Sequence, residues 1–294
     1  AGLAFAATGG TQSAVSISDD NGDTWMQVAF IDDVIVDIKD IAFNPTSDAA
    51  LLITSNGTQD SLWKVADVTA LVPFWQRTLC TGYSTDIVVF TMVEYSNDGV
   101  AIMLYSYDNA AIFRSTNDTR SFSNWRNTAS WGYIFDWVVP NSSTVYAAAN
   151  NGFWSTALVG SRLAGESPWS IDMSGNSLVV GTQNGSAFAS TDKGNTWGDE
   201  IVFNDVPSRP LVDVAFDAQY ATNKLFYYAT HAPGTVGKVL LNGNNVAVIG
   251  GEEQISVLRD GDGDACPGTY HRNIIVTPDN TLYVITDDYT GNTS

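Results

Sequence analysis

The chain has 294 residues, 44% of them hydrophobic, which is enough for one large domain with a sizeable core and excludes an intrinsically disordered chain. Acidic residues outnumber basic ones 32 to 13, a net charge of −19, which argues against nucleic acids and anionic membrane surfaces as partners because phosphate contacts need Lys and Arg. The same charge suits divalent cations and a secreted setting. No apolar run of about 18 residues occurs, so no transmembrane helix is predicted.

A short strand-like segment recurs along the chain at intervals of 34 to 51 residues. Blades of four short strands need about 40 to 50 residues, so this period predicts the repeating unit of a β-propeller. The six copies are 14–18, 61–65, 111–115, 152–156, 186–190 and, least clearly, 237–241.

A pair of β-rich runs precedes several of these segments, and Asn-Gly turns lead into them. Asn-Gly between β-rich runs is a strong hairpin signal. No long amphipathic helix is predicted, although single helical turns fit Ser61–Val72 and Leu158–Gly165. The strand pairs are 40–45 with 51–54, 137–140 with 145–148, 213–216 with 225–230, and 274–278 with 282–285; the turns are at Asn56, Asn151 and Asn184.

Residues 1–294 therefore form a single all-β domain of four-stranded antiparallel blades, with seven blades expected and six as the alternative. The chain begins at a second strand, Leu3–Thr8, and ends just after another second strand near Thr286. Both ends of the propeller are thus incomplete. Either the two ends combine into one blade, or the chain is an excerpt of a longer protein.

A turn motif follows three of the recurring strands, with the pattern Ser-x-Asp-x-Gly-x-Thr-Trp. Two copies match every fixed position and the third keeps the spacing. This pattern resembles the Asp-box, or BNR repeat, of sialidase-like β-propellers. The motif positions are Ser18, Asp20, Gly22, Thr24 and Trp25; Ser190, Asp192, Gly194, Thr196 and Trp197; and, in the degenerate copy, Ser115, Asn117 and Phe122.

The residues of the motif also predict, by themselves, a hairpin turn between strands three and four of a blade, in which the polar groups of the turn hydrogen-bond one another. Its Asp accepts hydrogen bonds from backbone N–H groups just ahead, and its Gly supplies positive φ. Its aromatic residue anchors the next strand, so Trp25, Trp197 and Phe122 are expected in the core. In the resembled family the box lies away from the catalytic face, and binding loops are expected on the opposite, inter-blade side.

The resemblance also implies what a catalytic member would carry, namely a Phe/Tyr-Arg-Ile-Pro motif, an arginine triad and a Tyr–Glu pair. The nearest motif here is Phe113-Arg114-Ser115-Thr116, which lacks Ile-Pro, and the eight arginines are not clustered. No catalytic residue is therefore nominated, and the sequence favours a protein that is not an enzyme.

A candidate cation site lies at Asp260, Asp262 and Asp264, where alternate carboxylates separated by Gly converge as the loop curls. Hard oxygen ligands of this kind suit Ca²⁺. The segment is not an EF-hand loop, because Ala265 and His271 stand where that loop needs Gly and Glu. A solvated acidic turn is the alternative.

The chain has two cysteines, Cys80 and Cys266, both in predicted inter-blade connections on one face. An even count in an extracellular-type composition favours a disulfide between them. The alternative is two separate thiols, because the loops would have to bring the two Cα atoms within about 7 Å.

Four aromatic residues alternate before the fourth unit, and Trp131 and Tyr133 are the candidate surface for stacking a polysaccharide. Alternation is also typical of a strand with one buried face, so core packing is the competing interpretation. Phe135 and Trp137 complete the alternating set.

Five Asn-x-Ser/Thr sequons and a low Lys content favour an extracellular or cell-surface location. The sequon asparagines are Asn56, Asn117, Asn141, Asn184 and Asn292.

These observations favour a non-catalytic extracellular β-propeller that acts as a structural or binding scaffold, for example in a surface-layer assembly, with other surface proteins or polysaccharide as partners and self-association possible. The alternative is a glycoside hydrolase of the Asp-box type, sialidase-like or endoglucanase-like. A third reading, an intracellular assembly factor of the photosystem-associated propeller type, fits the acidity and the sequons less well.

Overall fold

The computed structural model describes residues 4–8, 14–18, 25–30, 35–70, 73–81, 89–160, 162–203, 211–231, 236–242, 245–249 and 269–288. Within these ranges no helix is long and apolar enough to cross a membrane. The chain divides into two units. Unit 1 comprises Ala1–Gly132 and Val139–Val145, and unit 2 comprises Tyr133–Val138 and Tyr146–Ser294.

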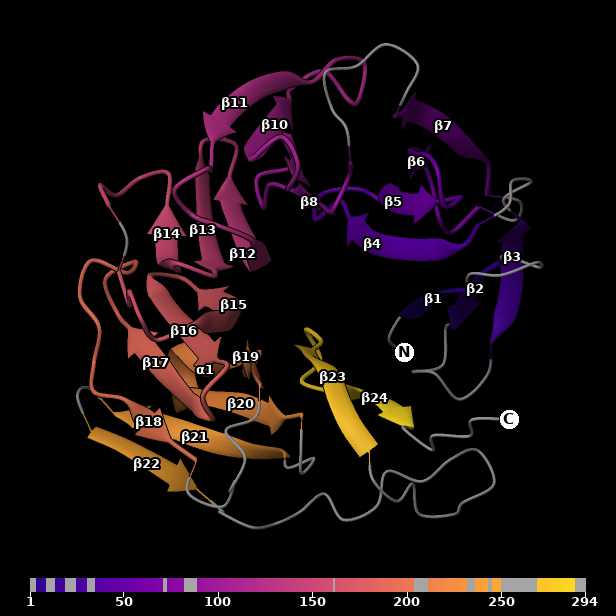
Figure 1. Ribbon diagram of the computed structural model, residues 1–294. Coiled ribbons are helices and arrows are strands. Elements are labelled where there is room, and N and C mark those ends of the chain that lie inside the picture. Colours follow the sequence, from indigo (N-terminus) through magenta and orange to yellow (C-terminus); the bar gives the residue numbers. More distant parts are fainter. Residues whose placement is uncertain are drawn as a thin grey trace, which may run out of the picture. The chain divides into compact units, whose positions relative to one another are not determined.

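The described residues form seven antiparallel sheets in which consecutive strands pair in chain order (Figure 1). This arrangement confirms the predicted all-β propeller class. The first three sheets comprise β1 (Ala4–Thr8), β2 (Ala14–Ser18) and β3 (Met26–Phe30); β4 (Asp37–Phe43), β5 (Ala50–Ser55), β6 (Asp60–Val65) and β7 (Trp75–Cys80); and β8 (Met92–Tyr95), β9 (Ile102–Ser106), β10 (Ala111–Ser115) and β11 (Ser123–Asn127).

The remaining four sheets contain four strands in two cases, three in one and two in the last. They comprise β12 (Ile134–Asn141), β13 (Thr144–Ala149) and β14 (Gly152–Ser155); β15 (Pro168–Ser174), β16 (Ser177–Thr182), β17 (Ser186–Ser190) and β18 (Ile201–Val202); β19 (Val212–Phe216), β20 (Leu225–Thr230), β21 (Val236–Asn242) and β22 (Asn245–Ile249); and β23 (Thr269–Val276) with β24 (Leu282–Asp288).

The strands follow the hydrophobic runs closely. Three of the recurring segments coincide with β2, β10 and β17, and the three Asn-Gly turns join the second strand of a sheet to its third. The single helical turns expected in Ser61–Val72 and Leu158–Gly165 are wrong. The only helix among the described residues is the one-turn α1 (Tyr220–Asn223). Ser61–Val65 belongs instead to strand β6, which is mostly buried.

Apolar side chains from neighbouring sheets form the core between them. In unit 1, Leu51 and Leu62 of one sheet share a cluster with Val93 and Leu104 of the next. In unit 2, Val179 packs with Phe226 in the same way. At three junctions the first strand of one sheet contacts the first two strands of the sheet before it. In unit 1, β8 contacts β4 and β5; in unit 2, β19 contacts β15 and β16, and β23 contacts β19 and β20.

The turns with the Asp-box-like pattern, called Asp-box turns below for their sequence alone, have the predicted hydrogen bonds where they are described. In the turn after β17, the Ser190 hydroxyl accepts the Gly194 N–H (2.9 Å) and Asp192 Oδ1 accepts the Thr196 N–H (2.8 Å). Asp192 Oδ2 accepts the Thr196 hydroxyl at 2.7 Å. These bonds hold the pKa of Asp192 below its usual value, the Thr196 N–H being the largest cause. The degenerate turn after β10 repeats these hydrogen bonds. The Thr119 N–H donates to the Ser115 hydroxyl, and the Ser121 N–H donates to Asn117 Oδ1.

The aromatic residues of the boxes are not uniformly buried. Trp197 is half-buried and meets Phe153 edge-on at 4.9 Å, and Phe122 packs against the core of unit 1. Trp25 is 48% exposed, so its expected core position is wrong. Trp197 differs from Trp25 in that a ring of another sheet, Phe153, packs against it. Asp20, Gly22 and Thr24 lie outside the described residues.

Candidate functional site

A half-buried carboxylate within the first strand recurs in three sheets. It accepts the N–H of the next residue in its own strand and the N–H of a residue in the first strand of the following sheet. We call these three residues the aspartate clamps. They are Asp40, bonded to Ile41 and Val93; Asp136, bonded to Trp137 and Ile171; and Asp172, bonded to Met173 and Phe216.

Burial raises the pKa of all three clamps, and their backbone N–H partners oppose the rise only in part. The pKa is about 7 for Asp40 and Asp136 and about 6 for Asp172. The pKa of Asp136 is raised further by the charges of Asp213 and Asp172.

Asp213 occupies the matching place in β19 but has different partners. It stands three residues before the Phe that ends its strand, as Asp40 does in β4. Its Oδ1 accepts the indole N–H of Trp169 at 3.0 Å, and its Oδ2 lies 2.7 Å from Nε2 of His231. Both members of the Asp213–His231 pair are buried, at 6% and 5% exposed. The Asp213 carboxylate therefore orients two rings from outside its own strand, those of Trp169 and His231.

The rings of Trp169 and His231 belong to a row of contacting rings in unit 2. Trp169 meets His231 edge-on with ring centres 5.7 Å apart, and its other neighbour, Phe135, lies at 4.9 Å. Phe135 in turn contacts Tyr133 at 5.1 Å. Trp169 and Phe135 are half-buried and Tyr133 is 37% exposed. We call Tyr133, Phe135 and Trp169 the ring strip.

The local backbone explains how these side chains meet at one edge of unit 2. Phe135, Trp169 and Asp213 stand near the starts of the first strands β12, β15 and β19, and His231 follows the second strand β20. Because first and second strands are antiparallel, these positions share one edge of each sheet. The pairing of β15 with β16 shifts register between Pro168 and Ser170, which marks a bulge at Trp169.

The edge that carries the ring strip is opposite to the Asp-box turns, as expected from the order of strands. In sheet β15–β18 the box joins β17 to β18 at the other ends of the strands. The ring strip therefore lies at the edge on which the sequence predicted binding loops, and the binding role itself stays a prediction.

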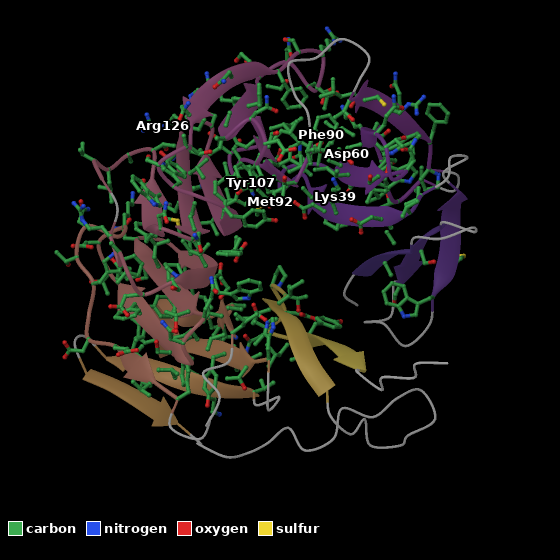
Figure 2. All side chains as sticks on the ribbon, in the orientation of Figure 1. Lys39, Asp60, Phe90, Met92, Tyr107 and Arg126 are labelled. Atoms are coloured by element: carbon green, nitrogen blue, oxygen red, sulfur yellow. The ribbon has the colours of Figure 1, made fainter. Side chains whose placement is uncertain are left out.

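Unit 1 carries a different pair at the bulge of its first strand. The register shift between Ile38 and Asp40 marks Lys39, whose Nζ lies 2.7 Å from Asp60 Oδ2. The same oxygen accepts the Phe90 N–H at 2.9 Å, and Asp60 is 5% exposed (Figure 2). This carboxylate is satisfied internally by a cation and an N–H, whereas the ring strip of unit 2 presents apolar surface.

The two residues expected to stack a polysaccharide differ in exposure. Trp131 is 4% exposed, in the core of unit 1, whereas Tyr133 is exposed and belongs to the ring strip. The strand begins only at Ile134, so Trp131 and Tyr133 precede it and the four aromatics do not alternate within one strand. Trp137 is buried at 5% exposed, in agreement with the core interpretation.

Other predicted sites are only partly visible. Asp260, Asp262, Asp264, Cys266 and Asn292 lie outside the described residues. Cys80 is half-buried at the end of β7, with its Sγ 3.7 Å from the Ser61 hydroxyl, and its pairing stays a prediction. In the described part of the chain, no three His, Cys, Asp or Glu side chains are placed to hold a metal ion.

Trp169, Asp213, His231 and Asp136 are not among the site residues predicted from the sequence. One signal for them was available: an Asp opens the repeated runs Asp40–Phe43 and Asp213–Phe216. What the sequence does not show is that one such Asp bonds backbone while the other bonds two side chains from different strands.

Comparison with known proteins places the chain in a fold class without naming a family. No family model matches the sequence, and no curated protein matches it. Three solved structures resemble it over at least 96% of its length. The first is described as YCF48 bound to D1 peptide, with a TM-score of 0.65, 12% identity and 86% of that chain covered.

The other two are described as putative 6-phosphogluconolactonases. The structure from Bacteroides fragilis has a TM-score of 0.67 and 9% identity with 86% of that chain covered. The structure from Bacteroides uniformis has a TM-score of 0.65 and 13% identity with 94% covered. At such low identity these likenesses establish the β-propeller fold alone.

Proposed function

We propose that this protein is a non-catalytic β-propeller that works outside the cell as a binding scaffold, and that the ring strip is its contact surface for a saccharide of a surface polymer. The observation that carries the proposal is the line of contacting rings from Tyr133 to Trp169, which the buried Asp213 holds in place.

The geometry of the ring strip suits a sugar. Sugar rings present flat C–H faces that pack on aromatic rings, and binding sites combine such apolar surface with a few fixed polar groups. Here the indole N–H of Trp169 is already bonded, so the orientation of the ring does not have to be fixed at the moment of binding.

The engagement of the nearby carboxylates supports a non-catalytic role. A glycosidase needs one carboxyl group to deliver a proton and a second to act as base or nucleophile. Both oxygens of Asp136 and of Asp172 accept backbone N–H groups, and both oxygens of Asp213 hold side chains. These bonds favour a structural role for each group.

Hydrolysis is the competing activity, and one observation favours it. The pKa of Asp136, raised to about 7 by burial, is one that a general acid uses. Release of reducing sugar from polysaccharides and ring opening of sugar lactones are the assays to run. Turnover by the wild-type protein that is lost in D136N would replace the scaffold proposal with an enzyme.

Composition supports the extracellular part of the proposal. The chain has 32 acidic and 13 basic residues and five sequons. A solved propeller with the same fold, YCF48, is described as bound to a peptide, which supports binding as a use of this fold.

The test is a titration of neutral and charged oligosaccharides into the wild-type protein and the variants W169A and F135A. We expect each variant to bind about tenfold more weakly, because each loses one ring of the ring strip. The matched control is W125A, which removes a half-buried tryptophan of unit 1 that lies under Arg114. Equal weakening by W125A, or unchanged binding by W169A, would contradict the proposal.

A further inference from the structure

The outer strand of sheet β8–β11 carries positive charge on a strongly acidic chain. β11 is the outermost strand of that sheet, and four of its five residues are exposed (Figure 1). In residues 109–135 the only acidic residue is Asp118, and Lys64 pairs with its carboxylate in a salt bridge. This edge of unit 1 therefore keeps a net positive charge. The same stretch contains three arginines: Arg114, Arg120 and Arg126.

Two of these arginines are exposed, and the third supports the strand. Arg120 lies in the turn that leads into β11, and Arg126 lies on the strand itself (Figure 2). On the neighbouring strand β10, Arg114 holds its guanidinium carbon 5.4 Å from the centre of the Trp125 ring and donates to the Ser142 carbonyl. We call Arg120, Trp125 and Arg126 the basic edge. It combines two exposed charges with an apolar ring whose position is fixed.

The outermost strand of sheet β15–β18 has the opposite charge. Asp199 and Glu200 immediately precede β18, and both are exposed. Val202, on the strand itself, is 51% exposed. We call Asp199, Glu200 and Val202 the acidic edge. Like the basic edge of unit 1, it places two exposed charges and an apolar side chain beside the outer strand of a sheet.

We propose that the basic edge of one copy of this protein binds the acidic edge of a second copy, so that copies join head to tail. Arginine forms bidentate pairs with carboxylates, and a second copy supplies two carboxylates next to an outer strand. Outer strands also present backbone groups that can pair with another chain. The contact uses no residue of the ring strip, so it does not depend on saccharide binding.

The two edges differ from each other, so the contact is heterologous. Each joined pair of copies still presents one edge of each kind, as an open-ended row of copies requires. The net charge of −19 on each copy opposes association at long range, whereas the edges attract at close range. Moderate salt favours the contact, because it screens charges more than about 10 Å apart more strongly than it screens neighbouring groups.

Sedimentation of the intact protein over a range of concentrations, in moderate salt, tests the contact. Wild-type protein should form species larger than a dimer as its concentration rises. R120Q/R126Q removes the charges of the basic edge, D199N/E200Q removes those of the acidic edge, and each variant should stay monomeric. An equimolar mixture of the two variants should form dimers and nothing larger, because only one intact pair of edges is left.

The two variants change the net charge in opposite directions. R120Q/R126Q makes the chain more negative by two charges, and D199N/E200Q makes it less negative by two. General repulsion would therefore shift their association in opposite ways, whereas the edge contact predicts the same loss in both. The variant R120E/R126E/D199R/E200R exchanges the signs, keeps the net charge and should restore association. The matched control is R77Q, on the outer strand β7, which should leave association unchanged.

Three results would overturn the proposal. Wild-type protein that stays monomeric at high concentration would do so, as would a mixture of the two variants that forms no more dimer than either variant alone. Monomeric wild-type protein that binds an oligoglutamate peptide through Arg120 and Arg126 would make another acidic protein the occupant. R120Q/R126Q should bind oligosaccharides as tightly as the wild-type protein, so failure of the edge contact leaves the proposed function intact.

Discussion

Gly194 and Thr119 occupy the same position of the Asp-box turn and show what that position requires. Gly194 has φ +80°, and a Cβ built there would lie 2.5 Å from the ring of Phe153. Thr119 has φ +68°, a conformation that costs a residue with a side chain about 1–2 kcal/mol. The degenerate box therefore retains the geometry of the motif at an energetic cost.

The first prediction contrasts these two positions. G194A should destabilise the protein by about 3 kcal/mol, because left-handed strain adds to a clash with a buried ring. T119G should stay within about 1 kcal/mol of wild type, because relief of strain offsets the loss of a buried threonine and the greater freedom of the unfolded chain. Urea unfolding monitored by tryptophan fluorescence measures both.

The control for this prediction is G165A. Gly165 has φ +93°, and nothing lies within 4 Å of a Cβ built there, so only the backbone strain remains. G165A should cost clearly less than G194A. Equal costs for G165A and G194A would contradict the role assigned to Phe153.

The second prediction concerns the order in which sequons are used, if the protein is made in a glycosylating host. At Asn56 and Asn141 the side-chain oxygen accepts bonds from residues just ahead, and the described residues provide no bond for the Nδ2 atom that carries a glycan. At Asn117 that atom donates to the Ser121 hydroxyl inside the box turn at 2.8 Å. Glycopeptide mass spectrometry should find Asn56 and Asn141 more fully occupied than Asn117, and the reverse order would contradict this.

At the scale of elements, the aspartate clamps join the first strand of one sheet to the first strand of the next. Each clamp satisfies two backbone N–H groups with one carboxylate. Since burial raises the pKa of these groups, the folded state binds their protons more tightly than the unfolded chain does.

The third prediction is the pH dependence that follows. With unfolded values near 3.8 and folded values of about 6 for Asp172 and about 7 for Asp40 and Asp136, the stabilisation from proton binding is complete below about pH 3.8. It is lost as the pH rises through 6 to 7. The urea midpoint should therefore fall between pH 5 and pH 8, and D40N and D172N should each flatten this fall.

Two other pH-dependent effects on the urea midpoint can be distinguished from titration of the clamps. The carboxyl groups whose pKa is lowered, such as Asp192 and Asp217, change charge below this window. General repulsion among acidic residues also grows with pH, but high salt screens it at exposed sites. A midpoint that rises from pH 5 to pH 8 at high salt would contradict the clamps as described.

At the scale of the whole molecule, the fold was predictable because it repeats. The strand periods, the Asn-Gly turns and the box motif each point to the same sheets, and the boxes after β10 and β17 fall between the third and fourth strands of their sheets. Agreement between several local signals is what makes an assignment of this kind secure.

The site was not predictable in the same way, because its contacts join residues far apart in sequence. Trp169 and Asp213 are 44 positions apart and meet through a bulge and the packing of two sheets. Likewise, the alternation of aromatics from Trp131 to Trp137 did not reveal that the strand starts at Ile134. Local pattern fixes which face a residue takes within a strand, but not which side chain of another sheet it meets.

The central claim is that the edge of unit 2 that carries the ring strip is the binding surface. Hydrogen exchange of the intact protein, with and without a saturating oligosaccharide that binds it, tests it most directly. We predict slower exchange in segments 134–138, 169–173 and 211–216, with the Asp-box turn at 190–197 unchanged. Protection confined to the box edge or to unit 1, or no protection despite measured binding, would contradict the account.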